Sequence, residues 1–196
     1  MEGTREIFVP RPEFGAAQDA MRADWYAVRV KSNFEEIAAT GLTARDHTVF
    51  LPTYKVRRRW SDRIKEIQVP LFSGYVFCQL QPSNTLPVLT APGVIDIVSF
   101  GRELAVVDER ELEAVRAVLR ASLGAKPRPY LESGRKVLIG EGPLRGVEGI
   151  VVESHGALSL VVSVSLLCRS LSVEVEREWV EPLKEFTAGA AGAGPS

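Results

Sequence analysis

The stretch GRKVLIGEGPLRGVEGIVV, residues 134–152, decides the fold of the C-terminal part of this chain. Two apolar runs that favour β-strands, 137–139 and 150–152, flank a glycine-rich segment. Gly142-Pro143 predicts a tight turn, and Gly146 and Gly149 permit a positive φ or a close approach of backbone. A nucleotide-binding loop is disfavoured, because no Lys-Ser/Thr pair follows and the next element is a strand.

Two further apolar runs, 158–164 and 171–176, continue this pattern toward the C-terminus. Short strands at even spacing are typical of a small barrel, so we expect an all-β barrel domain over 133–184. The runs are rich in valine and isoleucine, which lose side-chain freedom in helices. The sequence therefore predicts that this domain is β-structured rather than a helical lid.

The preceding part of the chain predicts a domain of mixed type over 24–123. Strand-like runs occur at 25–31, 49–54, 67–71, 74–80 and 94–100. Ser32 and Glu35 predict a capping box for a helix, and Asp108 and Glu111 predict a second one. Apolar residues at helical spacing follow both boxes. The fold class is therefore α+β, a mostly antiparallel sheet with flanking helices, followed by the small barrel.

The remaining segments predict no core of their own. Residues 1–23 carry prolines and mixed charges without an apolar period, which indicates a mobile, disordered arm. Residues 124–132 form a proline-stiffened linker that should leave few fixed contacts between the domains. Residues 185–196 are rich in alanine and glycine and are expected to be a disordered tail.

Composition narrows the functional class. The net charge of −1 gives the chain no general attraction to nucleic acid or membrane. Cys78 and Cys168 are expected to be buried free thiols, and no signal peptide or membrane span is predicted, which favours the cytoplasm. His47 and His155 are isolated, so no catalytic, metal or cofactor site is predicted and an enzyme is disfavoured.

Three motifs taken together resemble one family. Trp25-Tyr26, the run PLFSGYVF at 70–77 and the G-P-L-x-G-x-x-G pattern at 142–149 resemble the NusG family of bacterial transcription factors. The resemblance implies an N-terminal NGN domain and a C-terminal KOW domain. The RRWSDR segment at 58–63 and Pro70-Leu71-Phe72 look more like the specialised UpxY and RfaH paralogues than like the housekeeping factor.

The resemblance also implies a function. A monomeric NusG-like factor would bind elongating RNA polymerase, promote processivity or antitermination, and in the specialised group act on selected operons. Two departures concern details: Ser73 stands where the family usually has proline, and no His-Thr-Thr run follows the Tyr75 strand. The alternative from another class is a KOW-containing, ribosome-associated RNA-binding protein.

The family grips the clamp helices of the β′ polymerase subunit with an apolar patch on the NGN domain. Aromatic side chains suit such a surface because they bury a large area at low entropic cost. For Trp25 and Phe77, packing in the domain core is an equally good interpretation. The candidate polymerase-binding residues are Trp25, Tyr26, Phe72, Tyr75, Phe77 and Ile97.

A local cluster of positive charge predicts contact with DNA at the transcription bubble. Lysine and arginine bind phosphates, and a tryptophan within the cluster can stack on an unpaired base. A solvated hairpin tip is the competing interpretation. The candidate nucleic-acid residues are Lys31, Asn33, Lys55, Arg57, Arg58, Arg59, Trp60 and Arg63.

The KOW domain carries one further candidate site. Leu166, Leu167 and Arg169 correspond to the loop that in NusG meets a small-subunit ribosomal protein or the Rho factor. Leu167 stands where the family has an exposed aromatic residue, and leucine is a weaker anchor for a protein partner.

Overall fold

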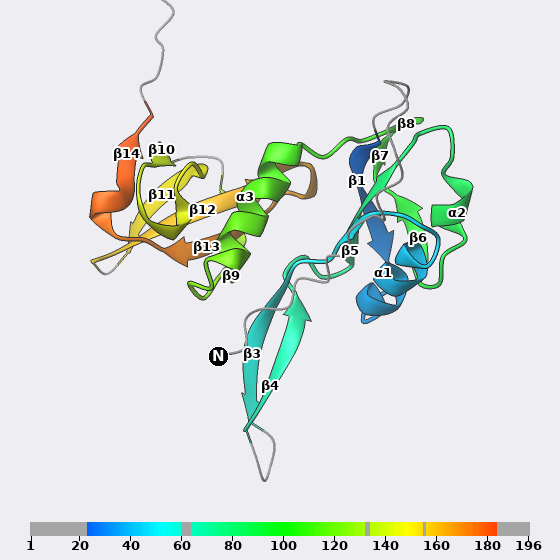
Figure 1. Cartoon of the computed structure of the whole chain (residues 1–196), viewed down its shortest axis with the longest axis horizontal. Coiled ribbons are helices and arrows are strands. Elements are labelled where there is room, and N and C mark those ends of the chain that lie inside the picture. Colours follow the sequence, from blue (N-terminus) through cyan, green and yellow to red (C-terminus); the bar gives the residue numbers. More distant parts are fainter. Residues whose placement is uncertain (1–22, 60–63, 132–133, 155, 184–196) are drawn as a thin grey trace, which may run out of the picture.

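The computed structural model describes residues 23–59, 64–131, 134–154 and 156–183. Its N-terminal part is a four-stranded antiparallel sheet with the order β2-β5-β1-β6 (Figure 1). The sheet consists of β1 (Asp24–Val30), β2 (Val49–Phe50), β5 (Tyr75–Leu80) and β6 (Val94–Ile97). β1 and β5 therefore lie in its middle and carry the predicted motifs.

Side chains alternate across this sheet, as the period of a strand requires. Tyr26 and Val28 of β1 belong to one buried cluster, whereas Trp25 and Ala27 belong to another. The first cluster is covered by α1 (Glu35–Thr43) and α2 (Leu86–Leu89), which contribute Ala38, Ala39, Leu42 and Val88. We call the side of the sheet that α1 and α2 cover the helical face.

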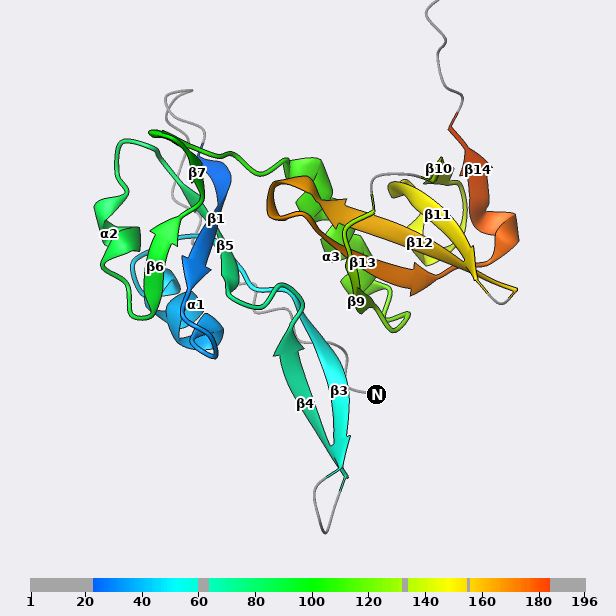
Figure 2. The ribbon, with the colours of Figure 1, turned by 180° about the vertical axis from the view of Figure 1, so that it is seen from behind.

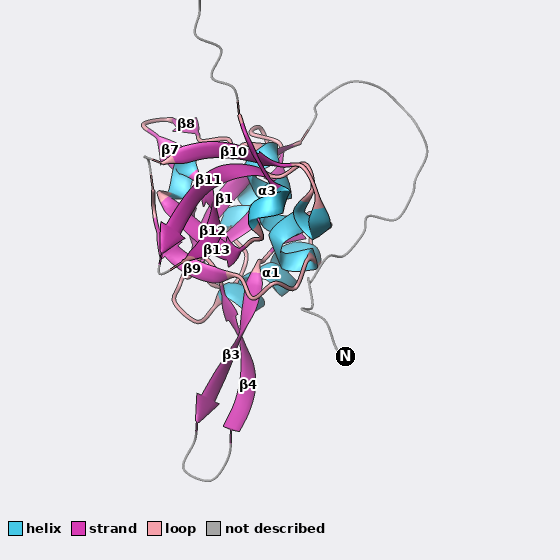
Figure 3. Cartoon of the chain, turned by 90° about the vertical axis from the view of Figure 1, so that its left-hand side faces the viewer, coloured by secondary structure: helices cyan, strands magenta, loops and turns pink. Residues whose placement is uncertain are grey.

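Two small hairpins extend from the sheet. β3 (Thr53–Arg59) and β4 (Ile64–Pro70) form a two-stranded ribbon that projects away from the rest of the molecule (Figures 1 and 3). β7 (Ser99–Phe100) and β8 (Glu103–Leu104) form a much shorter pair. The projecting ribbon presents Lys55, Arg57 and Arg59 of the predicted basic cluster to solvent.

The C-terminal part is a six-stranded antiparallel sheet with the order β14-β10-β11-β12-β13-β9. Its strands are β9 (Lys126–Pro129), β10 (Arg135–Ile139), β11 (Glu148–Ser154), β12 (Ala157–Val164), β13 (Arg169–Glu174) and β14 (Val180–Pro182). The predicted β structure is confirmed. Within the described residues, β14 and β9 remain edges, so closure of the barrel stays a prediction.

The opening glycine motif behaves as the sequence predicts. Residues 142–144 form the short 3₁₀ turn η1, in which Gly142 has a φ of +76°. A side chain at Gly149 would place its Cβ 2.6 Å from the carbonyl oxygen of Val161 on the neighbouring strand. Glycine is therefore required there by close approach of the backbone. Two further 3₁₀ turns, η2 (Ser165–Leu167) and η3 (Arg177–Trp179), follow β12 and β13.

The helix α3 (Glu109–Arg120) connects the two parts (Figure 2). Its apolar residues Leu112, Val115 and Leu119 are buried, and the helix contacts β12 and η1. One apolar cluster runs from Trp25 through α3 into the C-terminal sheet. The expectation of few contacts between the two parts is therefore wrong. The predicted domain boundaries themselves stay predictions.

Several local expectations also change. The capping box at Ser32 is wrong: α1 has no side-chain cap, and Glu35 instead accepts a hydrogen bond from the Gly74 N–H at 2.8 Å. Asp108 does cap α3 by accepting from the Arg110 N–H. The predicted linker contains β9, since Lys126–Pro129 pair with β13. Cys78 is buried as expected, but the expectation for Cys168 is wrong: it is exposed and has a left-handed conformation at the C-cap of η2.

Candidate functional site

Four aromatic rings gather on the side of the N-terminal sheet opposite α1 and α2. Trp25, Phe50 and Phe77 come from β1, β2 and β5, and Phe72 comes from the turn before β5. The Phe77 ring stacks on Phe50 at 6.0 Å and meets Phe72 edge-to-face at 5.7 Å. We call Trp25, Phe50, Phe72 and Phe77 the aromatic face. Stacked and edge-to-face contacts stabilise a pair of rings by more than the burial of their surface area alone.

The turn that carries Phe72 and Tyr75 is fixed from two sides. Gly74 has a φ of +84°, donates its N–H to the carboxylate of Glu35, and accepts from the Val30 N–H at 2.9 Å. Glu35 is itself buried. A buried carboxylate needs such a donor, so this bond ties the turn to the first residue of α1.

Arg116 of α3 covers the aromatic face. Its guanidinium lies 4.7 Å from the centre of the Trp25 ring and 4.6 Å from that of Phe50. It also forms an ion pair with Glu113 on the same helix. A cation held between two rings is attracted by both π systems, and desolvation strengthens the attraction. α3 therefore contacts the C-terminal sheet with its apolar side and the aromatic face with Arg116.

The structure brings together only part of the predicted polymerase-binding set. Trp25, Phe72 and Phe77 share the aromatic face, and Tyr75 packs against the same cluster. Tyr26 and Ile97 lie on the helical face instead. Of the six residues, all except Tyr75 are buried in this arrangement.

Sequence reasoning missed Phe50 and Arg116. Phe50 carried a usable signal, since an aromatic residue in a short strand run is a candidate for the same sheet. Arg116 carried none, because an arginine on an amphipathic helix is ordinarily solvated.

The predicted nucleic-acid residues lie mainly on the β3–β4 ribbon. The register pairs Arg57 with Glu66 and Arg58 with Lys65. Arg57 contacts the Glu66 carboxylate at 3.3 Å and Lys55 lies 4.0 Å from it, so one acid offsets part of the positive charge. Lys31, Asn33 and Arg59 are exposed. Trp60, Arg63 and the side chain of Arg58 lie outside the described residues.

The predicted partner loop of the C-terminal domain faces the N-terminal part. Leu166 and Leu167 pack against the common apolar cluster. Arg169 places its guanidinium 5.6 Å from the centre of the Tyr75 ring, and the Ser165 N–H donates to Glu111 of α3 at 3.1 Å. The loop is thus part of the contact between the two parts of the molecule.

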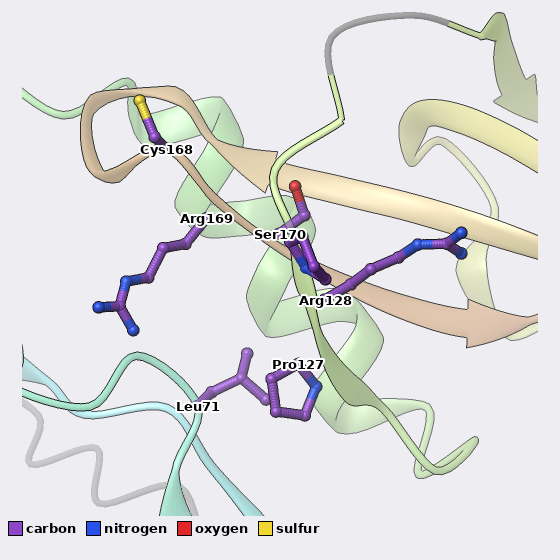
Figure 4. Close-up of a pocket in the computed structure, with 7 residues that line it drawn as sticks. Leu71, Pro127, Arg128, Cys168, Arg169 and Ser170 are labelled. Carbon is purple, nitrogen blue, oxygen red and sulfur yellow. The ribbon is translucent and has the colours of Figure 1, made fainter.

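A hollow of about 410 Å³ lies beside this loop (Figure 4). Leu71 approaches from the N-terminal part and Pro127 from β9, while Arg128 and Arg169 extend in different directions. The two guanidinium groups therefore do not form a joint anion site. The other lining residues are Pro129, Cys168 and Ser170.

The helical face holds the titratable groups with clear shifts caused by burial. Burial raises the pKa of the Cys78 thiol to about 12. Burial also raises the pKa of Tyr26, with a smaller contribution from Asp24. Both shifts disfavour the charged form and are typical of a dry core. Among the described residues, no helix is long and apolar enough to cross a membrane, and no group of three potential metal ligands occurs.

The geometry defines a two-part protein, in which an α+β sheet with an aromatic face joins an antiparallel β-sheet through α3. Residues 23–116 match the family described as transcription termination factor nusG. The chain is 28% identical over 180 residues to the transcription termination/antitermination protein NusG of Escherichia coli K12, which covers 83% of this chain and 98% of that protein. It is 25% identical over 175 residues to the NusG of Pseudomonas aeruginosa, covering 82% and 99%.

A solved structure shows the same fold. The structure titled "Domain interaction in Thermotoga maritima NusG" aligns with a TM-score of 0.51 at 22% identity, covering 85% of this chain and all of that one. Over residues 23–116 and in its relatives, this chain is similar to the NusG family of transcription termination and antitermination factors, and the solved structure shows a similar fold. Members of that family are transcription factors and not enzymes.

Proposed function

We propose that this protein binds elongating RNA polymerase through the aromatic face and favours its processive, antiterminating state. The single observation that carries the proposal is the gathering of Trp25, Phe72 and Phe77, from separate segments, on one side of the sheet with Tyr75 beside them. Clustered aromatic side chains are the usual anchors of a protein–protein interface. The partner surface is the pair of clamp helices of the β′ subunit.

The aromatic face must be uncovered before it can bind. Arg116 and the 165–169 loop cover it in the present arrangement, which we call the closed arrangement. When only a fraction of the molecules is in the binding-competent state, the apparent affinity is reduced to that fraction of the intrinsic affinity. Polymerase binding therefore requires α3 and the C-terminal sheet to move away, and it draws the equilibrium toward that open state.

The β3–β4 ribbon supplies the second contact. It projects away from the sheet (Figure 1) and carries the exposed Lys55, Arg57 and Arg59. A bound polymerase would bring this ribbon to the DNA at the transcription bubble, where phosphate contacts add salt-sensitive affinity. Action on selected operons, as in the UpxY and RfaH group, is the narrower form of this proposal and rests on the 58–63 segment and Pro70-Leu71-Phe72.

The 165–169 loop is proposed as the site for a small-subunit ribosomal protein or Rho. Leu166, Leu167 and Arg169 would reach such a partner only in the open state, because they now contact the rest of the molecule. The protein would act as a monomer in the cytoplasm, with no cofactor.

Binding of a β′ clamp-helix fragment to the full chain tests the proposal. Tyr75→Ala should weaken binding by about 1–4 kcal/mol, the usual range for an aromatic anchor. Phe100→Ala is the matched control, because Phe100 is exposed and lies on the separate β7–β8 pair. Equal affinity of the parent and Tyr75→Ala would remove this surface from the interface. Copurification of ribosomes without polymerase would favour the RNA-binding alternative.

A further inference from the structure

The turn before β5 presents Tyr75, the one residue of the predicted polymerase-binding set that is not buried. The carbonyl oxygen of Phe72 accepts a hydrogen bond from the Tyr75 N–H at 3.1 Å, and Gly74 has a φ of +84°. A hydrogen bond between residues i and i+3, with a positive φ at i+2, is the pattern of a type II turn. We call residues 72–75 the Tyr75 turn.

Ser73 occupies position i+1 of the Tyr75 turn, where the sequence leaves the backbone free. Its φ is negative, which is the conformation that proline fixes at this position of a type II turn. Serine does not lock φ in this way, and the exposed Ser73 side chain contributes little packing. The shape of the turn therefore depends on contacts from neighbouring elements.

Glu35 of α1 supplies the strongest of these contacts. Its carboxylate accepts the Gly74 N–H at 2.8 Å, and the residue is only 5% exposed. A hydrogen bond to a charged acceptor is about twice as strong as one between neutral groups. The carbonyl oxygen of Gly74 accepts from the Val30 N–H of β1 at 2.9 Å. Gly74 is therefore held by α1 and by β1 at once.

The hydrogen bond of Glu35 is not a helix cap. Glu35 is the first residue of α1, and no side chain caps this helix. An acidic residue in the first turn commonly interacts with the free N–H groups of its own helix. Glu35 instead accepts from a turn 39 residues away, whereas its neighbour Glu36 is exposed. The side chain of Glu35 thus serves the turn.

We propose that Glu35 is a positioning residue of the partner-binding surface: its carboxylate holds the Tyr75 turn, which Ser73 leaves loose, in the shape that presents Tyr75. The effect on the shape of the turn stands on these contacts alone, whereas the effect on affinity rests on the proposed function. Ser73→Pro should make the carboxylate dispensable, because proline fixes the same φ covalently.

Amide hydrogen exchange of the full chain tests the positioning role without any partner. Glu35→Ala should speed exchange at Gly74 and Tyr75 by about tenfold relative to Val28 and Val76, which pair with each other in the sheet. Glu35→Gln keeps an acceptor oxygen and should leave this ratio unchanged. If Glu35→Ala does not fold, Glu35→Asp replaces it, because its carboxylate keeps the charge at the helix but is one methylene too short.

Two further variants separate the turn from general stability. Glu36→Ala removes the exposed acid beside Glu35 and should change nothing at the turn. Glu35→Ala combined with Ser73→Pro should restore slow exchange at Tyr75 but not at Gly74, whose acceptor is still missing. An equal rise at all four amides in Glu35→Ala would show a general loss of stability, and fast exchange at Tyr75 in the combined variant would show that the turn does not need fixing. Either result would overturn the proposal.

Binding of the β′ clamp-helix fragment tests the consequence. Glu35→Ala should weaken binding by about tenfold, as expected for one lost hydrogen bond to a charged group. Glu35→Gln and Glu36→Ala should bind like the parent, and Ser73→Pro should restore the affinity of Glu35→Ala. Parent-like affinity of Glu35→Ala would overturn the positioning role while leaving the proposed function intact. If the parent itself does not bind, the proposed function fails, and the exchange ratios still decide the role of Glu35.

Discussion

The two faces of the N-terminal sheet are buried to a similar degree but by different means. On the helical face, Val28, Val76 and Cys78 pack against α1 and α2, which belong to the same part of the chain. On the aromatic face, Trp25 and Phe50 pack against Arg116 of α3. The same helix also contacts β12 of the C-terminal sheet. Adjacent residues of β5, Val76 and Phe77, fall on the two different faces.

Under the proposed function, this difference separates a permanent core from an interface. A purely apolar layer loses stability when it is opened, because nothing else can cover it. An arginine over aromatic rings can return to water at lower cost, and the exposed rings can then bind a partner. Under the proposed function, a similarly buried surface is a permanent core on one side of the sheet and a binding surface on the other.

The largest expected effect is a loss of stability on the helical face. Leu42→Ala removes a fully buried side chain of α1 and should lower the free energy of unfolding by about 2–5 kcal/mol. Ile37→Ala on the same helix is the control, because Ile37 is half exposed, and its effect should stay within about 0.5 kcal/mol. Urea unfolding measures both. Similar losses for the two variants would contradict the assignment of this face as the core.

The next largest effect is expected on the aromatic face, where a substitution should strengthen binding. Arg116→Ala removes the cation from Trp25 and Phe50 and should shift the protein toward the open state. The apparent affinity for the clamp-helix fragment should rise about tenfold, which corresponds to a desolvated cation–π contact of about 1–2 kcal/mol. Arg110→Ala, an exposed arginine on the same helix, serves as control. Weaker binding by Arg116→Ala would place Arg116 in the polymerase interface itself.

Alkaline pH should affect the helical face through Cys78. Its pKa is raised to about 12 in the folded chain, so the thiol stabilises the fold below the unfolded pKa and loses that contribution as the pH rises toward 12. Above the ordinary thiol pKa of 9.0, the free energy of unfolding should fall by up to about 1.4 kcal/mol per pH unit. Cys78→Ala should show a shallower decline in unfolding experiments at pH 9 to 11 than Cys168→Ser. Parallel curves for the two variants would argue against a dry site around Cys78.

The smallest effect on fragment binding is expected from the ribbon. Arg57→Glu with Arg59→Glu should leave affinity for the clamp helices unchanged, because both arginines are exposed on a ribbon that projects away from the rest of the molecule. The same pair of substitutions should reduce pause suppression in transcription assays. The slope of log affinity against log salt concentration should become shallower by about 0.7–0.9 for each phosphate contact that is lost. Arg102→Glu, in the β7–β8 turn, controls for net charge. If the double variant suppresses pausing as fully as the parent at two salt concentrations, the ribbon is only a solvated surface.

Much of the fold could be predicted from local pattern. The valine-rich runs became β11 and β12, and the Asp108 cap began α3 one residue later. β9 was missed because its two prolines read as a linker, yet proline is tolerated on an edge strand, and β9 is one. α2 was missed because it has only four residues, too few to show a helical period.

The candidate site was less predictable, because it depends on contacts between distant parts of the chain. The alternation of side chains along β1 predicts that Trp25 and Tyr26 lie on opposite faces of the sheet. It does not predict which of the two faces α1 covers. Glu35 looked like a cap from its spacing to Ser32, whereas its actual partner is 39 residues away. The burial of Arg116 likewise follows from packing between α3 and the sheet, which no local pattern records.

Hydrogen exchange of the full chain, with and without the clamp-helix fragment, tests most directly whether the aromatic face is a separable interface. The account predicts slower exchange at residues 72–77 of the complex, where the fragment binds, and faster exchange at residues 165–171, which lose their contacts with Tyr75 and α3. Slower exchange in both segments, or unchanged exchange at 165–171 in a saturated complex, would contradict it.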